Sequence, residues 1–158
     1  MTRELKQQYT LRISRANKTQ MIVILYEVLL VYVEEARVAH EQGDRAGFKE
    51  GIRKARGCVK ELMESLHFEY DPARNLLQLY LYVSQELTRA DIHNRTEELE
   101  HIRQVIEKLH GAYEEISKQD TSGPVMENTQ TVYAGLTYGK NTLTENLADQ
   151  GSSRGFRA

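Results

Sequence analysis

The chain has 158 residues, enough for one domain or for one domain with an additional arm, and its formal charge of −2 is spread evenly. The sequence contains no basic stripe, so we expect no nucleic-acid partner. The longest apolar run, residues 21–33, is thirteen residues long, whereas a membrane span needs roughly twenty. Because no secretory signal opens the chain either, we expect no membrane insertion and a cytoplasmic location, which the single cysteine, Cys58, also fits.

Hydrophobic periodicity predicts an all-α protein, an antiparallel up-and-down four-helix bundle with a short N-terminal leader and a C-terminal arm. We expect the leader over residues 1–16, the bundle over 17–119, and a linker with the arm over 120–158. The helices are expected at about 17–42, 45–67, 72–92 and 95–119. Their brief connections require neighbouring helices to run antiparallel.

Polar residues and one proline mark where these helices begin. Asp44, after the break at Gly43, is expected to cap the second helix. Pro72 follows Asp71 at a favoured first helical position of the third. Asn94, with Glu97 three residues later, is expected to cap the fourth.

The first bundle helix has more apolar surface than one core can cover. One stripe is expected to face the core, namely Ile22, Leu25, Leu29, Tyr32 and Ala36. A second, offset by one residue, needs another cover in this chain or in a partner, and contains Val23, Tyr26, Leu30 and Val33. The third helix is also apolar nearly all round in its first half, with Leu77, Leu79, Leu81 and Tyr82. This surplus predicts a helical protein that binds an apolar helix.

The spacing Glu-x-x-His, which di-iron helical bundles use, occurs at 64/67, 98/101 and 107/110. The pairs in the last helix flank its apolar stripe, so we place Glu98 and His101 on a partly solvated rim. Inward carboxylates that would complete a metal site are missing from the pattern. We therefore expect no metal, no cofactor and no catalytic residue, and we interpret Cys58 as a half-buried structural thiol.

Three runs of residues, in this order, match one family. The first is Ala16 to Glu27; the second contains Lys54-Ala55, Glu61-Leu62 and Ser65-Leu66; the third contains Asn75-Leu76, Leu79 to Tyr82, Leu87 and Ala90-Asp91. Tyr9 and Tyr113 match two further family aromatics. Over residues 9–118 the chain resembles the FliS family of flagellar secretion chaperones. It departs from the family pattern at Lys18, His67 and Asp91, which are mostly cap and turn positions, and in its long C-terminal arm.

The resemblance implies a chaperone without enzyme activity. Its client would be the C-terminal segment of flagellin, which is disordered alone, becomes helical on the chaperone, and otherwise drives polymerisation. The resemblance also implies docking at the gate of the flagellar type III export apparatus. The N-terminal leader would cover part of the groove when no client is present.

The surplus stripes indicate a client groove formed by Val23, Tyr26, Leu30, Leu77, Leu81 and Tyr82, with Tyr9, Leu11 and Ile13 as its lid. The alternative is a self-associating helical adaptor or structural bundle, a homodimer that uses the same surface and binds no flagellin. In the arm, helical spacing relates Val132, Leu136, Leu143 and Leu147. These residues form a candidate plug that mimics the client; a loosely held tail is the alternative interpretation.

Overall fold

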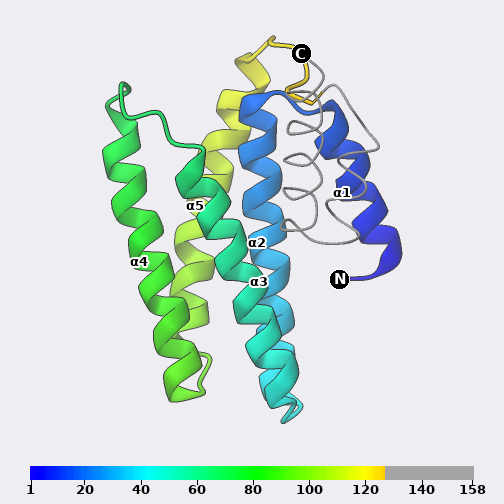
Figure 1. Cartoon of the computed structure of the whole chain (residues 1–158), viewed down its shortest axis with the longest axis vertical. Helices are drawn as coiled ribbons and strands as arrows, with labels where there is room; N and C mark the ends of the chain where they lie inside the picture. Colours follow the sequence, from blue (N-terminus) through cyan, green and yellow to red (C-terminus); the bar gives the residue numbers. More distant parts are fainter. Residues whose placement is uncertain (127–158) are drawn as a thin grey trace, which may run out of the picture. The chain divides into compact units, whose positions relative to one another are not determined.

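A computed structural model describes residues 1–126, so the arm residues Val132, Leu136, Leu143 and Leu147 lie outside the described part. Its regular structure consists of five helices, α1 (Arg3–Arg15), α2 (Lys18–Glu41), α3 (Arg45–Glu64), α4 (Pro72–His93) and α5 (Glu97–Gln119) (Figure 1). The all-α class is therefore confirmed over residues 1–126. None of these helices has the length and apolar character needed to cross a membrane.

The chain divides into two compact units. The α2–α5 unit contains Thr19–Thr121 and Met1. The α1 unit contains Thr2–Lys18 and the segment that begins at Ser122. Each unit is described by itself.

In the α1 unit, residues expected to form a polar leader form a helix. The Thr2 side chain caps it by accepting a hydrogen bond of 3.2 Å from the Leu5 amide. The segment after α5 is hydrogen-bonded to the residues that follow α1, because the Val125 amide donates to the Ala16 carbonyl over 3.0 Å. The Asn17 side-chain amide also donates to the Ser122 carbonyl, over 3.4 Å.

In the α2–α5 unit, α3 packs against α4 and α4 against α5. The colour gradient of Figure 1 shows the chain direction reversing at each connection between these helices. The connections are brief, and the first contains Gly43 at φ 71°, a left-handed turn that glycine adopts without strain. Asp44 then caps α3 as predicted, since its side chain accepts a hydrogen bond of 2.9 Å from the Gly47 amide.

The start of α5 was predicted wrongly. Asn94 is instead the C-cap of α4 and directly follows its last helical residue. Its φ of 49° is left-handed, and its backbone amide donates to the carbonyls of Ala90 and Asp91, which ends that helix. Thr96 is the residue that precedes α5. Pro72, by contrast, opens α4 as predicted.

The core is one cluster of buried side chains contributed by α2, α3, α4 and α5. From α2 it takes Tyr26, Leu29, Val33 and Ala36, at helical three- and four-residue spacing. The predicted division of α2 into a core stripe and an offset surplus stripe is therefore wrong. Tyr26 and Val33 of the second stripe are core residues, whereas Tyr32 of the first is only partly buried.

Candidate partner-binding site

The residues predicted to line one groove have different environments. Tyr26 has no exposed surface and belongs to the core, and Val23 is buried as well. Leu30 and Leu77 are partly buried. Leu81 and Tyr82 of α4 keep 46% and 38% of their surface exposed. The α4 members are thus available to a partner in this conformation, and Tyr26 is not.

The three predicted lid residues belong to α1. Tyr9 is buried and its ring lies under the Arg12 guanidinium, 5.4 Å from the ring centroid. Leu11 is exposed and Ile13 is partly buried. These three side chains therefore do not share one exposed face of the helix.

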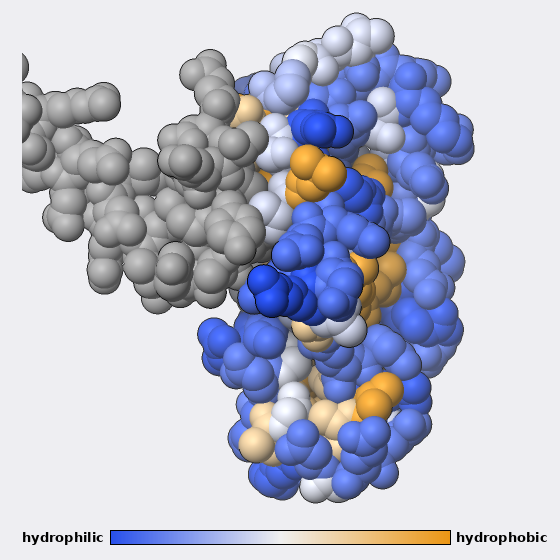
Figure 2. Space-filling model, turned by 90° about the vertical axis from the view of Figure 1, so that its right-hand side faces the viewer, coloured by the Kyte–Doolittle hydropathy of each residue, from blue (hydrophilic) through white to orange (hydrophobic). Residues whose placement is uncertain are grey.

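Exposed apolar side chains gather around the first half of α4. We call the α4 patch the set Phe68, Tyr70, Leu79, Leu81 and Tyr82. These are five of the ten large hydrophobic residues exposed within residues 1–126, and they lie within fifteen consecutive positions. On the face shown in Figure 2, by comparison, hydrophilic residues predominate and the hydrophobic ones form separate spots. Such concentration of apolar surface is typical of a protein-binding site.

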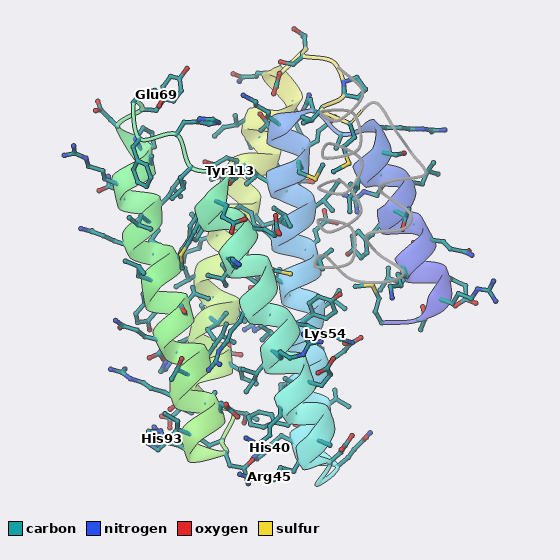
Figure 3. The ribbon with its side chains drawn as sticks, viewed as in Figure 1. His40, Arg45, Lys54, Glu69, His93 and Tyr113 are labelled. Atoms are coloured by element: carbon teal, nitrogen blue, oxygen red, sulfur yellow. The ribbon has the colours of Figure 1, made fainter. Side chains whose placement is uncertain are left out.

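A pocket of about 240 Å³ opens near this patch, and we call it the end pocket. It is lined by residues of α2, α4 and α5 and of the α3–α4 connection, namely Ile22, Ser65, Leu66, His67, Tyr70, Pro72, Ala73, Leu76, Tyr80 and Tyr113. Figure 3 shows Tyr113 towards the same end of the α2–α5 unit as Glu69 of that connection, with His40, Arg45 and His93 at the other end. Tyr70 belongs to both the pocket lining and the α4 patch.

Three tyrosines form the aromatic wall beneath the end pocket. Tyr26 packs edge-on against Tyr113, with ring centroids 5.6 Å apart, and lies 6.4 Å from Tyr80. The hydroxyls of Tyr26 and Tyr80 share a buried hydrogen bond of 2.6 Å. Burial raises the pKa of Tyr80 to about 12 and raises the pKa of Tyr26 and of Tyr113 as well. All three rings are therefore neutral at physiological pH and suit an apolar guest.

Two buried carboxylates of the α4–α5 interface were missed by the sequence analysis. Glu86 and Glu98 each expose only 3% of their surface, so the expected position of Glu98 on a solvated rim is wrong. Glu86 accepts hydrogen bonds of 2.9 Å from Arg89 and from His101. The position of Glu86, three residues after Val83 and beside Leu87, was the available signal.

Arg95 compensates the charge of Glu98. Burial raises the pKa of Glu98, but hydrogen bonds from the Arg95 side chain and from the Glu98 backbone amide outweigh it, and the pKa lies below its ordinary value. Arg95 Nε donates to Glu98 Oε1 over 2.8 Å, while Oε2 is buried with no hydrogen-bond partner. Within residues 1–126, no three His, Cys, Asp or Glu side chains are grouped so that they could hold a metal ion. The Glu86–His101 pair connects α4 to α5, whereas Arg95 pairs with Glu98 at the start of α5.

Comparison with known proteins places this architecture in a family. The family model described as flagellar protein FliS matches residues 1–120, a range that contains all five helices and ends directly after α5. No curated protein sequence matches the chain. The match covers well over half of the 158 residues and confirms the resemblance found over residues 9–118. The chain belongs to the FliS family of flagellar export chaperones.

Proposed function

We propose that this chaperone binds the C-terminal segment of flagellin in apolar grooves of an antiparallel four-helix bundle made by α2 to α5. Binding there prevents premature polymerisation and aids delivery to the type III export apparatus from the cytoplasm. Complementary surfaces account for this binding, and no covalent chemistry is needed. Membership of the family supports the general role.

The α4 patch is the observation that carries the flagellin proposal. A helical client presents apolar side chains every three or four residues, and it needs a partner surface with matching apolar contacts. Leu81 and Tyr82 supply such contacts on one helix. The end pocket, which Tyr70 of the patch also lines, can take one anchoring side chain of the client. The buried Tyr26 then supports the end pocket from behind, through Tyr80 and Tyr113, rather than touching the client.

The family resemblance adds a role for the leader. We propose that Tyr9, Leu11 and Ile13 compete with the client for part of its groove. The export gate is the second proposed partner, also by family membership.

A peptide of the flagellin C-terminal segment titrated into the full-length chain tests the proposal. Leu81→Asp should weaken binding at least tenfold, since it replaces an apolar contact worth about 1–2 kcal/mol by a charge that must be desolvated. Gln42 is also exposed but follows α2 at the end of the unit opposite the end pocket, so Gln42→Asp adds the same charge away from the patch and should leave affinity within about twofold. Both variants should melt within a few degrees of the parent chain. Equal affinity of the two variants for the peptide would contradict the proposal.

The alternative function, a self-associating adaptor, uses the same patch. It predicts that the parent chain is a tight dimer, that Leu81→Asp dissociates it, and that no flagellin peptide binds. Light scattering over a range of protein concentrations separates this outcome from a monomer that binds the peptide.

A further inference from the structure

We propose that the surface shared by α3 and α4 prefers a client helix with acidic side chains beside its apolar stripe, and that Arg56 and Lys60 of α3 provide this preference. The inference rests on the proposed function, because it specifies the chemistry of the client that contacts Leu81 of the α4 patch. We call this surface the α3–α4 face and define it by Lys49, Arg56, Lys60, Leu77 and Leu81.

The helices that adjoin α4 differ in charge. With histidine counted as neutral, α3 contains six basic and three acidic residues and has a formal charge of +3, whereas α5 contains three basic and six acidic residues and has −3. α4 packs against both and is neutral, with two residues of each sign. An apolar client on the α3 side of α4 therefore meets positive charge, which attracts acidic side chains.

Two contacts show which side of α3 adjoins α4. Lys49 Nζ lies 3.2 Å from Asp91 Oδ1, and Arg56 Nη2 donates a hydrogen bond of 3.1 Å to Thr88 Oγ1. Lys60 follows Arg56 by four residues, so it lies on the same side of α3. These three cations therefore follow the boundary between the two helices, which lie side by side in Figure 1.

The same contacts place an exposed leucine of α4 next to one of these cations. Leu81 precedes Thr88 by seven residues and Asp91 by ten. Because α3 and α4 run in opposite directions (Figure 1), counting equally far along α3 from the two contacts puts Leu81 opposite residues 59–63, which include Lys60. Leu81 exposes 46% of its surface and the Lys60 side chain 72%, so a partner can touch both.

The guanidinium of Arg56 has unused hydrogen-bonding capacity. It makes one hydrogen bond, to Thr88, and no salt bridge in the described part of the chain, although a guanidinium has several more N–H donors. Its Nε is buried without a partner, which costs free energy. A carboxylate of the client that accepts hydrogen bonds from the other nitrogens would offset part of this cost.

Lys60 is also available to a partner. It lies 3.7 Å from Glu64 in the next turn of α3, and both side chains are largely exposed. Exposed pairs of this kind contribute little to stability. A client carboxylate can therefore replace Glu64 at the ammonium group at low cost.

The apolar residues of the face favour a helical peptide over nucleic acid. A phosphate backbone would pair with the cations but leave Leu81 in water. The chain as a whole has a formal charge of −2, which opposes the approach of a long polyanion. A helix with acidic residues one turn beyond its apolar residues can contact Leu81 and the two cations together.

Two designed peptides test this preference without flagellin. Both are alanine-rich helices with leucines at four-residue spacing, and they carry either glutamates or lysines beside the leucines. The full-length chain should bind the glutamate peptide at least about fivefold more tightly in anisotropy titrations at low salt. Arg56→Gln with Lys60→Gln should abolish the preference. Arg45→Gln with Lys108→Gln removes the same charge from exposed positions outside the α3–α4 face and should retain it.

Folding is checked by thermal melting, in which all variants should lie within a few degrees of the parent. Lys60→Gln alone, at an exposed position, should already reduce the preference, so the test does not depend on the stability of Arg56→Gln. No preference in the parent, or a preference that survives in Arg56→Gln with Lys60→Gln, would overturn the inference.

The same variants are then titrated with the flagellin peptide, in its natural form and with its aspartates and glutamates replaced by the amides. Arg56→Gln with Lys60→Gln should weaken binding of the natural peptide by about three- to tenfold and leave binding of the amide form unchanged. Equal weakening of both forms would overturn the inference while the proposed function stands. If the flagellin peptide binds none of these proteins, the proposed function fails, while the designed peptides still decide the charge preference.

Two other partners are outcomes of the same experiments. Displacement of the glutamate peptide by an oligonucleotide of equal charge would show that the face recognises charge alone. Self-association of the parent chain in light scattering, lost in Arg56→Gln with Lys60→Gln, would make a second copy the partner. Either result would overturn the inference.

Discussion

The hydroxyl pair of Tyr26 and Tyr80 provides the sharpest test of how the candidate site is built. Tyr26 has no exposed surface and Tyr80 has 1%. Tyr26→Phe keeps the ring in contact with Tyr113 but removes one side of the 2.6 Å hydrogen bond. The Tyr80 hydroxyl is then buried with its donor or acceptor lost, because no solvent reaches it.

The expected loss follows from that geometry. A buried polar group left without its partner costs about 1–3 kcal/mol of unfolding free energy. Tyr26→Phe and Tyr80→Phe should each destabilise the chain by about that amount. The double variant removes both hydroxyls and leaves nothing unsatisfied, so it should be no less stable than either single variant. Tyr26→Ala, which deletes the ring as well, should cost about 3–5 kcal/mol.

Urea unfolding followed by far-ultraviolet circular dichroism measures these differences. With a slope of about 2 kcal/mol/M, a loss of 2 kcal/mol moves the midpoint by about 1 M. The flagellin peptide should still bind folded Tyr26→Phe with nearly parental affinity, because Tyr26 supports the site from the core. A double variant that loses the sum of the two single losses would refute this reasoning. A Tyr26→Ala chain that is stable yet binds no peptide would also refute it, and would show that Tyr26 contacts the client.

Three further predictions concern residues of α3 and α4. A Cβ on Gly51 would lie 2.8 Å from the Ala36 Cβ and 2.9 Å from the Ala36 backbone nitrogen, so Gly51→Ala should lower the unfolding free energy in urea by about 1–3 kcal/mol. Gly57 is exposed and a Cβ there meets no other atom, so Gly57→Ala should instead raise the unfolding free energy by up to about 1 kcal/mol. The folded pKa of Tyr80 is about 12 and its unfolded value about 10. The contribution of Tyr80 to the unfolding free energy should therefore be constant below about pH 10 and be lost between about pH 10 and 12, with a matching rise in tyrosinate absorbance that Tyr80→Phe reduces. Burial raises the pKa of the Cys58 thiol to about 12, so a thiol reagent should label native protein only as fast as the chain opens, and subdenaturing urea should speed the labelling.

Sequence patterns predicted the helices better than their faces. In α3 the apolar residues recur clearly at three- and four-residue spacing, and the row that they form is buried, namely Phe48, Ile52, Ala55, Val59 and Leu62. In α2, residues 21–33 include a single charge, so periodicity cannot tell which side faces the core. Packing of Tyr26 against Tyr80 determines which side of α2 faces the core, and that contact joins residues 54 positions apart.

The misplaced residues of the site have local explanations. Asn94 has the side chain of a helix N-cap, but asparagine also tolerates the left-handed conformation that ends a helix, and here the second property applies. The charge of Glu98 favoured a partly solvated position at the rim. Arg95, one helical turn earlier, provides a partner that permits its burial. The exposure of Leu81 and Tyr82 was predictable from the apolar surplus of α4, whereas the end pocket depends on the mutual arrangement of three helices and the α3–α4 connection.

The pair of Glu86 and His101 connects the helix that carries the patch to its neighbour α5, and this connection should respond to pH. The hydrogen bond to Glu86 raises the pKa of His101 above its ordinary value of about 6.5. Its stabilisation is therefore fully present below the unfolded pKa and is lost as the pH rises through the folded pKa.

His101→Gln keeps a neutral donor towards Glu86 at every pH and serves as the reference. Between pH 6 and 8 the parent chain should lose unfolding free energy relative to this variant, and high salt should shrink the difference because the imidazole is half exposed. The loss should stay small, since Arg89 still pairs with Glu86 after His101 is neutral. Parallel pH profiles of the two proteins would show that the histidine contributes no charge to this interface, and that Arg89 alone compensates the buried carboxylate.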